Sequence, residues 1–184
     1  MKILALADKS PGLRLDYFIA ENHIDLVITL GDLIREDLLT LENVAIPKIG
    51  VYGNHDSGNY MPEFGILNLH MATWDFRGLK FGGFEGCVRY KENPDAIMYT
   101  QGQASAMFAN FPPVDIFLAH CPPRGINDEE EIAHQGWDGL RAYLERTPPR
   151  VLFHGHTYPT AENLVREFNG CRIEYVFKYK VVEI

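Results

Sequence analysis

Short apolar runs that stop at a glycine or a polar residue recur along the whole chain. They lie at residues 3–7, 25–30, 46–52, 79–84, 114–119 and 151–153. Each has the length of a strand and is apolar at most successive positions, which is typical of a strand buried on both faces of a sheet. Segments with helical spacing separate several of these runs, so the pattern predicts parallel strands with helices packed over the sheets.

Three segments between the apolar runs are expected to form helices. The first has apolar side chains at helical spacing, at Leu13, Tyr17 and Phe18, and the last is amphipathic and stops before Pro148. The three predicted helices lie at residues 13–20, 100–110 and 137–145.

Two further runs near the C-terminal end, at residues 164–168 and 172–176, flank the dipeptide Asn169-Gly170. Asn-Gly is the favoured two-residue turn of a β-hairpin, so we expect an antiparallel pair beside the parallel strands. No repeat, low-complexity tract or linker interrupts the pattern. The sequence therefore predicts one domain over residues 1–184.

Charge and composition restrict the class of partner. The chain has 184 residues, of which 46% are hydrophobic and 23% charged, as in a globular protein. The formal net charge is −8, which argues against a nucleic-acid backbone as the main partner, because such proteins usually carry a basic face. An anionic substrate stays compatible with this charge when a metal ion supplies local positive charge.

Cysteine usage and the N-terminal segment indicate the compartment. The three cysteines are widely spaced, which does not suit a disulfide framework or a cysteine-based zinc site. The longest apolar run is shorter than a membrane span, and the N-terminal run reaches the charged Asp8 too soon for a signal peptide. We therefore expect a cytoplasmic protein with no membrane partner. The sequence does not determine its oligomeric state.

Five of the predicted strands stop at residues with polar side chains. Because the carboxyl ends of parallel strands meet at one edge of a sheet, we expect these side chains to converge. Gly31, Gly53 and Gly155 stand among them and let the backbone turn sharply. Carboxylate, amide and imidazole groups suit a borderline divalent cation such as Mn, Fe, Zn or Ni. The residues are Asp8, Asp32, Asn54, His55, Asp56, His120 and His156.

In order and spacing these residues resemble the motifs of the calcineurin-like metallophosphoesterases, and residues 120–136 are similar to a bacterial branch of that family. The family motifs run D-x-H, G-D, G-N-H-[D/E], H and G-H-x-H. The resemblance implies a four-layer α/β/β/α sandwich of two mixed sheets, with a metal site at the strand ends. The motifs stand here as Asp8-Lys9-Ser10, Gly31-Asp32, Gly53-Asn54-His55-Asp56, His120 and Gly155-His156-Thr157-Tyr158.

The resemblance also implies the ligands of two metal positions. The first position keeps only Asp8 and the shared Asp32, because Ser10 and Tyr158 stand where the family has histidines. A serine hydroxyl is a weak neutral ligand, and a tyrosine must lose a proton of pKa about 10 before it binds a metal. The second position keeps all of its ligands, which are Asp32, Asn54, His120 and His156.

His55 and Asp56 stand beside the ligands. By resemblance, His55 stabilises charge on the phosphoryl group or donates a proton to the leaving oxygen, and an imidazole suits that task near neutral pH. Asp56 is expected to orient the ring of His55. The simpler alternative is that residues 54–56 only build a turn.

Three further side chains are candidates for contacts with the substrate. Arg124 can meet a phosphate through two hydrogen bonds, although a salt-bridged arginine explains this residue equally well. His134, together with Glu131, matches a position of the bacterial branch. Tyr158 would act as a neutral hydrogen-bond donor to the phosphate or to the attacking water.

The resulting hypothesis is a metal-dependent phosphoesterase that hydrolyses a small phosphomonoester or phosphodiester by metal-activated water, with one tightly bound metal. The alternative is a catalytically weak or inactive binding module of the same fold. Ser10 and Tyr158 favour the module, whereas the retained His55 favours the enzyme. A GTPase or dinucleotide-binding domain is disfavoured, because the first strand is not followed by a P-loop or a Gly-x-Gly-x-x-Gly motif.

Overall fold

The computed structural model describes residues 1–56 and 59–184 and contains two large mixed sheets. In order across the first sheet, the strands are β13 (Lys178–Glu183), β1 (Lys2–Ala7), β2 (Leu26–Thr29), β3 (Lys48–Gly50) and β4 (Leu67–Asn68). In order across the second sheet, they are β11 (Glu167–Phe168), β12 (Cys171–Tyr175), β10 (Val151–His154), β9 (Ile116–Ala119), β6 (Leu79–Phe84) and β5 (Thr73–Phe76). β7 (Cys87–Val88) and β8 (Met98–Tyr99) form a separate parallel pair.

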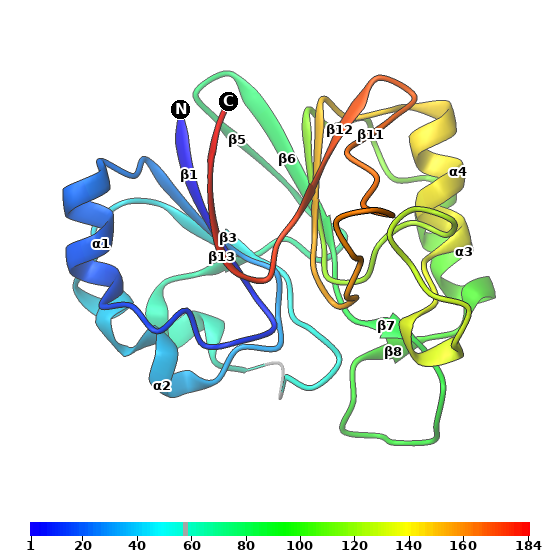
Figure 1. Ribbon diagram of the computed structural model, residues 1–184, viewed down its shortest axis with the longest axis horizontal. Coiled ribbons are helices and arrows are strands. Elements are labelled where there is room, and N and C mark those ends of the chain that lie inside the picture. The colour runs from blue at the N-terminus through cyan, green and yellow to red at the C-terminus, as the bar shows by residue number, and fades with distance from the viewer. Residues whose placement is uncertain (57–58) are drawn as a thin grey trace.

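The helices lie on the two outer faces of the sheets. α1 (Leu15–Asn22) and α2 (Arg35–Leu38) lie beside the first sheet, and α3 (Gln101–Ala109) and α4 (Asp138–Arg146) lie beside the second (Figure 1). The described connecting segments include 3-10 helices at Leu39–Asn43, Met61–Phe64 and Ile132–His134. Within the described residues, no helix combines the length and the hydropathy needed to cross a bilayer.

Three apolar clusters hold these layers together. The central cluster packs β1, β2 and β3 against β6, β9 and β10, and it includes Ile28 from the first sheet and Leu118 from the second. A second cluster, with Leu15 and Ile19, joins α1 to the outer face of the first sheet. The third, with Trp137, joins α3 and α4 to the second sheet. The predicted four-layer α/β/β/α sandwich is therefore confirmed.

The apolar runs mark most of the strands that the structure contains. β1, β2, β3, β6, β9 and β10 all lie within or overlap the predicted runs, and β1-β2-β3 and β6-β9-β10 pair in parallel. The hairpin of β11 and β12 is antiparallel, and both Asn169 and Gly170 have positive φ, as a tight two-residue turn requires. The segment predicted at residues 100–110 begins with a capping box, in which Thr100 and Gln103 bond reciprocally.

One long strand is absent from the sequence prediction. β13 pairs antiparallel with β1 in the register Lys2–Glu183, so the two ends of the chain lie side by side (Figure 1). It occupies the edge of the first sheet and buries only Val182 fully. Because an edge strand needs few apolar residues, its sequence carries little of the signal that marks the central strands.

Candidate active site

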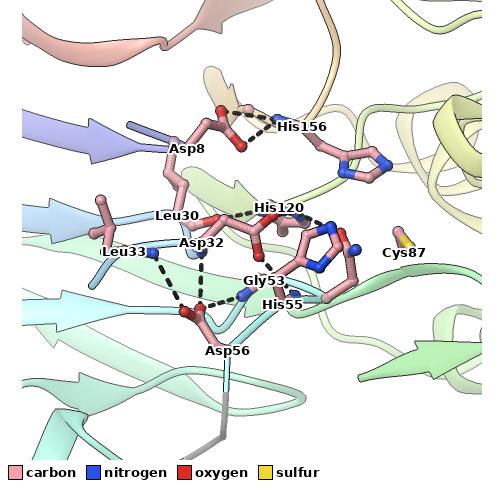
Figure 2. A network of polar contacts seen from close by, with 12 residues as sticks. Asp8, Leu30, Asp32, Leu33, Gly53, His55, Asp56, Cys87, His120 and His156 are labelled. Carbon is pink, nitrogen blue, oxygen red and sulfur yellow. Dashed lines mark hydrogen bonds and ion pairs between the residues drawn. The ribbon is translucent and has the colours of Figure 1, made fainter. Parts of the chain in front are cut away.

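His120 follows β9 and is completely buried at the edge where the parallel strands end. Its Nδ1 lies 2.7 Å from the carbonyl oxygen of Leu30, and because a carbonyl only accepts, this nitrogen carries a proton. In the neutral ring, Nε2 then presents a lone pair. That atom lies 3.0 Å from Oδ1 of Asn54. It also lies 3.5 Å from Oδ2 of Asp32 (Figure 2). With His120 neutral, three acceptor atoms thus face one another, whereas the protonated ring would donate from Nε2.

His156 brings a second imidazole to the same point. Its Nε2 lies 2.7 Å from the carbonyl oxygen of Ala133, so Nε2 is the donor and Nδ1 is left with the lone pair. The ring centroids of His120 and His156 are 4.8 Å apart, and one potential ligand atom from each of Asp32, His120 and His156 lies within 4.8 Å of the others. The four residues expected to form the complete metal position therefore lie together.

Burial and neighbouring charges shift the pKa values of these groups. Burial opposes charge on His120, but the carboxylates of Asp32 and Asp8 outweigh it and raise the pKa of the imidazole. Burial and the neighbouring His120 hold the pKa of His156 well below its ordinary value, and burial raises the pKa of Asp8 to about 6. A divalent cation would stabilise the ionised carboxylates and the neutral imidazoles together. The donor set fits a borderline transition metal.

Glycines allow the site loops to approach one another closely. A Cβ on Gly31 would lie 2.0 Å from the backbone nitrogen of Gly53, and a Cβ on Gly53 would lie 2.1 Å from Oδ1 of Asp32. Only Gly31 of these two has positive φ, whereas Asp8, Asp32 and His156 themselves adopt left-handed φ. The sharp backbone turns are therefore made largely by the site residues, and the glycines provide room for them.

Asp56 holds two of the site loops together. Its carboxylate accepts hydrogen bonds from the backbone N–H groups of Asp32 at 2.9 Å, Leu33 at 3.2 Å and Gly53 at 2.7 Å (Figure 2). It also accepts one from the hydroxyl of Tyr60 at 3.3 Å. The sequence prediction gives Asp56 a different contact, with the ring of His55. Instead, these backbone donors engage both carboxylate oxygens, and the described hydrogen bonds of Asp56 do not include that ring.

The other metal position, at Asp8, has few strong ligands. Asp8 accepts the backbone N–H of His156 at 3.0 Å on both carboxylate oxygens. The hydroxyl of Ser10 turns outward and donates to Oδ1 of Asp37. Tyr158 is 56% exposed and packs its ring against His134 and Phe177. Among the residues expected at this position, Asp8 and Asp32 are the strong ligands, and the neutral Ser10 and Tyr158 do not fit a second resident metal.

A cavity of about 270 Å³ opens at the strand ends. The exposed His55 lines it, and its backbone N–H donates to Oδ1 of Asp32 at 2.8 Å. His134 lines it too, with its ring centroid 5.4 Å from that of His156, so the structure brings both candidate histidines to the site. The lining residues are Asp8, Lys9, Asp32, Leu33, Ile34, His55, Asp56, His134, His156 and Tyr158.

Arg124 does not line this cavity. Its guanidinium lies 3.3 Å from Asp128 and 3.5 Å from Glu130, which is the salt-bridged alternative for this residue. Glu131 lies 3.5 Å from His134 and is also outside the lining set. Conversely, sequence reasoning gives no role to Lys9, although its place directly after Asp8 is a signal that could have identified it.

Comparison with known proteins supports the same fold. A family model described as "Calcineurin-like phosphoesterase" matches residues 13–159. One crystal structure has a TM-score of 0.68 and 16% identity, covering 94% of this chain and 89% of that chain. The protein TT1561 of Thermus thermophilus has a TM-score of 0.60 and 18% identity, covering 84% of this chain and 80% of that chain. No curated protein matches the chain.

Proposed function

Because the chain belongs to the calcineurin-like phosphoesterase family, we propose that it hydrolyses a small phosphomonoester or phosphodiester with one tightly bound divalent transition metal. The observation that carries this proposal is the convergence of Nε2 of His120, Oδ1 of Asn54 and a carboxylate oxygen of Asp32. No proton lies between these atoms when His120 is neutral. A cation satisfies all three lone pairs at once.

Asp32, Asn54, His120 and His156 are the residues that would hold the metal. The chemistry that such an ion supplies when bound is polarisation of a phosphoryl oxygen and activation of water at neutral pH. The hydrogen bonds from His120 to Leu30 and from His156 to Ala133 fix both rings in the tautomer that ligation needs.

His55 is positioned to act on the phosphoryl group. Its backbone N–H is bound to Asp32, whereas its ring is exposed to the cavity. An imidazole in this place can hold a proton for the leaving oxygen and stabilise charge that develops on phosphorus-bound oxygens. Asp56 supports this arrangement indirectly, because it ties the backbone of residues 32 and 33 to that of Gly53.

Tyr158 and His134 also line the cavity. Partial burial and the carboxylates of Asp8 and Asp32 raise the pKa of Tyr158, so its hydroxyl stays protonated at neutral pH and can donate a hydrogen bond to a phosphate oxygen. The ring of His134 packs against both Tyr158 and His156. The cavity volume suits a phosphoryl group with a small substituent.

A binding module with little catalytic activity is the second candidate. It is favoured by the first metal position, where Ser10 is bonded to Asp37 and Tyr158 is largely exposed. Such a module would hold one metal and a phosphate without turnover.

Metal analysis and hydrolysis assays on the same preparation test the proposal. Protein purified without chelator is analysed for metal and assayed on p-nitrophenyl phosphate and bis-p-nitrophenyl phosphate with added Mn²⁺, beside the variant His120→Ala. We expect one metal per chain and hydrolysis of at least one ester, with both lost in His120→Ala. Bound metal without hydrolysis would favour the binding module, and hydrolysis that survives in His120→Ala would contradict the proposed site.

A further inference from the structure

Carboxylates outnumber lysines and arginines among the residues that line the cavity at the strand ends. Asp8, Asp32 and Asp56 all line it, and Lys9 is the one lysine or arginine among its lining residues. A phosphate group carries negative charge and would be repelled by three carboxylates unless cations offset them. One metal alone offers less positive charge than the two metals of the complete family site. Some other group of this chain must therefore compensate.

Lys9 can supply this positive charge, because it lines the cavity. It follows Asp8 directly, at the point where the left-handed φ of Asp8 turns the chain away from β1. The side chain is exposed, and Lys9 forms no ion pair with any part of the chain that the structure describes. Arg35 and Arg124 are engaged elsewhere, because Arg35 pairs with Glu63, and Arg124 pairs with Asp128.

Lys9 is adjacent to Asp8, the ligand that remains at the incomplete metal position. The two hydrogen bonds from the backbone of His156 to Asp8 fasten the loop that contains Lys9 to the loop that contains Tyr158. Lys9 and Tyr158 both line the cavity, whereas the hydroxyl of Ser10 is bonded to Asp37. Lys9 and Tyr158 thus line the cavity beside Asp8, the residue that remains of the incomplete metal position.

We propose that Lys9 binds the phosphate group of the substrate and supplies the positive charge that the incomplete metal position lacks. This inference rests on the proposed function. A lysine ammonium offers three donors on a flexible stem and binds phosphate as a point charge, so it can follow the phosphoryl oxygens without an ordered coordination shell. Lys9 is then a substrate-binding residue whose contribution needs no second metal.

Phosphate binding measured by calorimetry tests this inference. Inorganic phosphate is titrated into the Mn²⁺-loaded protein and into the variants Lys9→Met and Lys9→Arg, and metal content is measured for each. Lys91→Met is the matched control, because Lys91 is also exposed but lies outside the cavity and stacks on Tyr90. Lys9→Met should weaken phosphate binding by about tenfold or more, the usual scale of a charged hydrogen bond. Lys9→Arg should retain most of the affinity, Lys91→Met should be unchanged, and all variants should keep their metal.

Two results would overturn the inference. Phosphate binding by Lys9→Met at the unmodified affinity would show that Lys9 does not contact the anion. Loss of metal from Lys9→Met would show that the residue acts on the metal site and not on phosphate. Failure of the proposed function is distinguishable, because it would be seen as an absence of ester hydrolysis in the unmodified, metal-loaded protein. Absence of phosphate binding by that protein would contradict both.

Discussion

Nδ1 of His120, at the end of β9, lies 2.7 Å from the carbonyl oxygen of Leu30, at the end of β2. This hydrogen bond crosses from one sheet to the other. It also fixes the proton of His120 on the nitrogen that faces away from Asp32 and Asn54. The proposed metal ligands thus come from both sheets, and the site forms only when the two sheets pack together.

Metal binding should therefore stabilise the fold. Mn²⁺ at a hundred times its Kd should add about 2.7 kcal/mol to the free energy of unfolding of metal-stripped protein. For a chain of this length that corresponds to a rise in Tm of about 5–10 °C. Differential scanning calorimetry with and without Mn²⁺ measures the rise. His120→Ala is the control and should show no rise, and an equal shift in that variant would place the metal elsewhere.

Replacement of His55 should separate chemistry from metal binding. Because the His55 ring lines the cavity but is not among the proposed ligands, His55→Ala should lower turnover by about a hundredfold or more, the usual scale of acid–base catalysis. Bound metal should stay near that of the unmodified protein. Steady-state kinetics and metal analysis on one preparation provide both values. Lost metal with unchanged turnover per bound metal would make His55 a ligand.

Asp56→Asn tests whether Asp56 holds the two site loops together. An amide NH₂ in place of one carboxylate oxygen would face backbone N–H groups that need an acceptor, so we expect a loss of about 2–3 kcal/mol in the free energy of unfolding. Urea denaturation measures this loss. An unchanged unfolding free energy combined with lower turnover would support the sequence-based prediction, in which Asp56 orients the ring of His55.

Close approach at Gly53 gives a steric test with a matched control. A Cβ there would lie 2.1 Å from Oδ1 of Asp32, so Gly53→Ala must displace the carboxylate and should both destabilise the fold by about 1–3 kcal/mol and weaken metal binding. A Cβ on Gly102, in α3, would meet no atom closer than 4.0 Å, and Gly102→Ala should leave metal binding unchanged without destabilising the fold. Thermal unfolding measures the stability of both variants, and Mn²⁺ titration measures their metal affinity. Normal Mn²⁺ affinity in Gly53→Ala would remove Asp32 from the ligand set.

Restoring the two histidines should rebuild the incomplete metal position. Ser10→His combined with Tyr158→His frees Asp37 from its bond with Ser10 and adds two imidazoles beside Asp8. We expect the metal content to rise from one toward two per chain and phosphodiesterase activity to increase. Mass spectrometry of metals after dialysis measures the content. A double variant that still holds one metal would show that these two histidines are not sufficient to restore the first metal position.

The central strands and the convergence of polar residues at their ends could be predicted from the sequence because both follow from local pattern. Buried parallel strands need continuous apolar runs, and polar residues at their ends must meet at one edge. The directions in which the side chains of Ser10 and Arg124 point could not be predicted in this way. Ser10 bonds to the carboxylate of Asp37, and Arg124 pairs with the carboxylate of Asp128. The positions of both carboxylates are set by the folded chain. The same holds for Asp56, whose partners lie on the backbone of a neighbouring loop, and for β13, which pairs with the opposite end of the chain.

Anomalous diffraction from crystals grown with Mn²⁺ tests the central claim most directly, because it gives both the number and the position of bound ions. The account predicts one strong peak per chain, within bonding distance of Asp32, Asn54, His120 and His156. The absence of a peak there, or two equally occupied peaks with the second on Asp8, would contradict it.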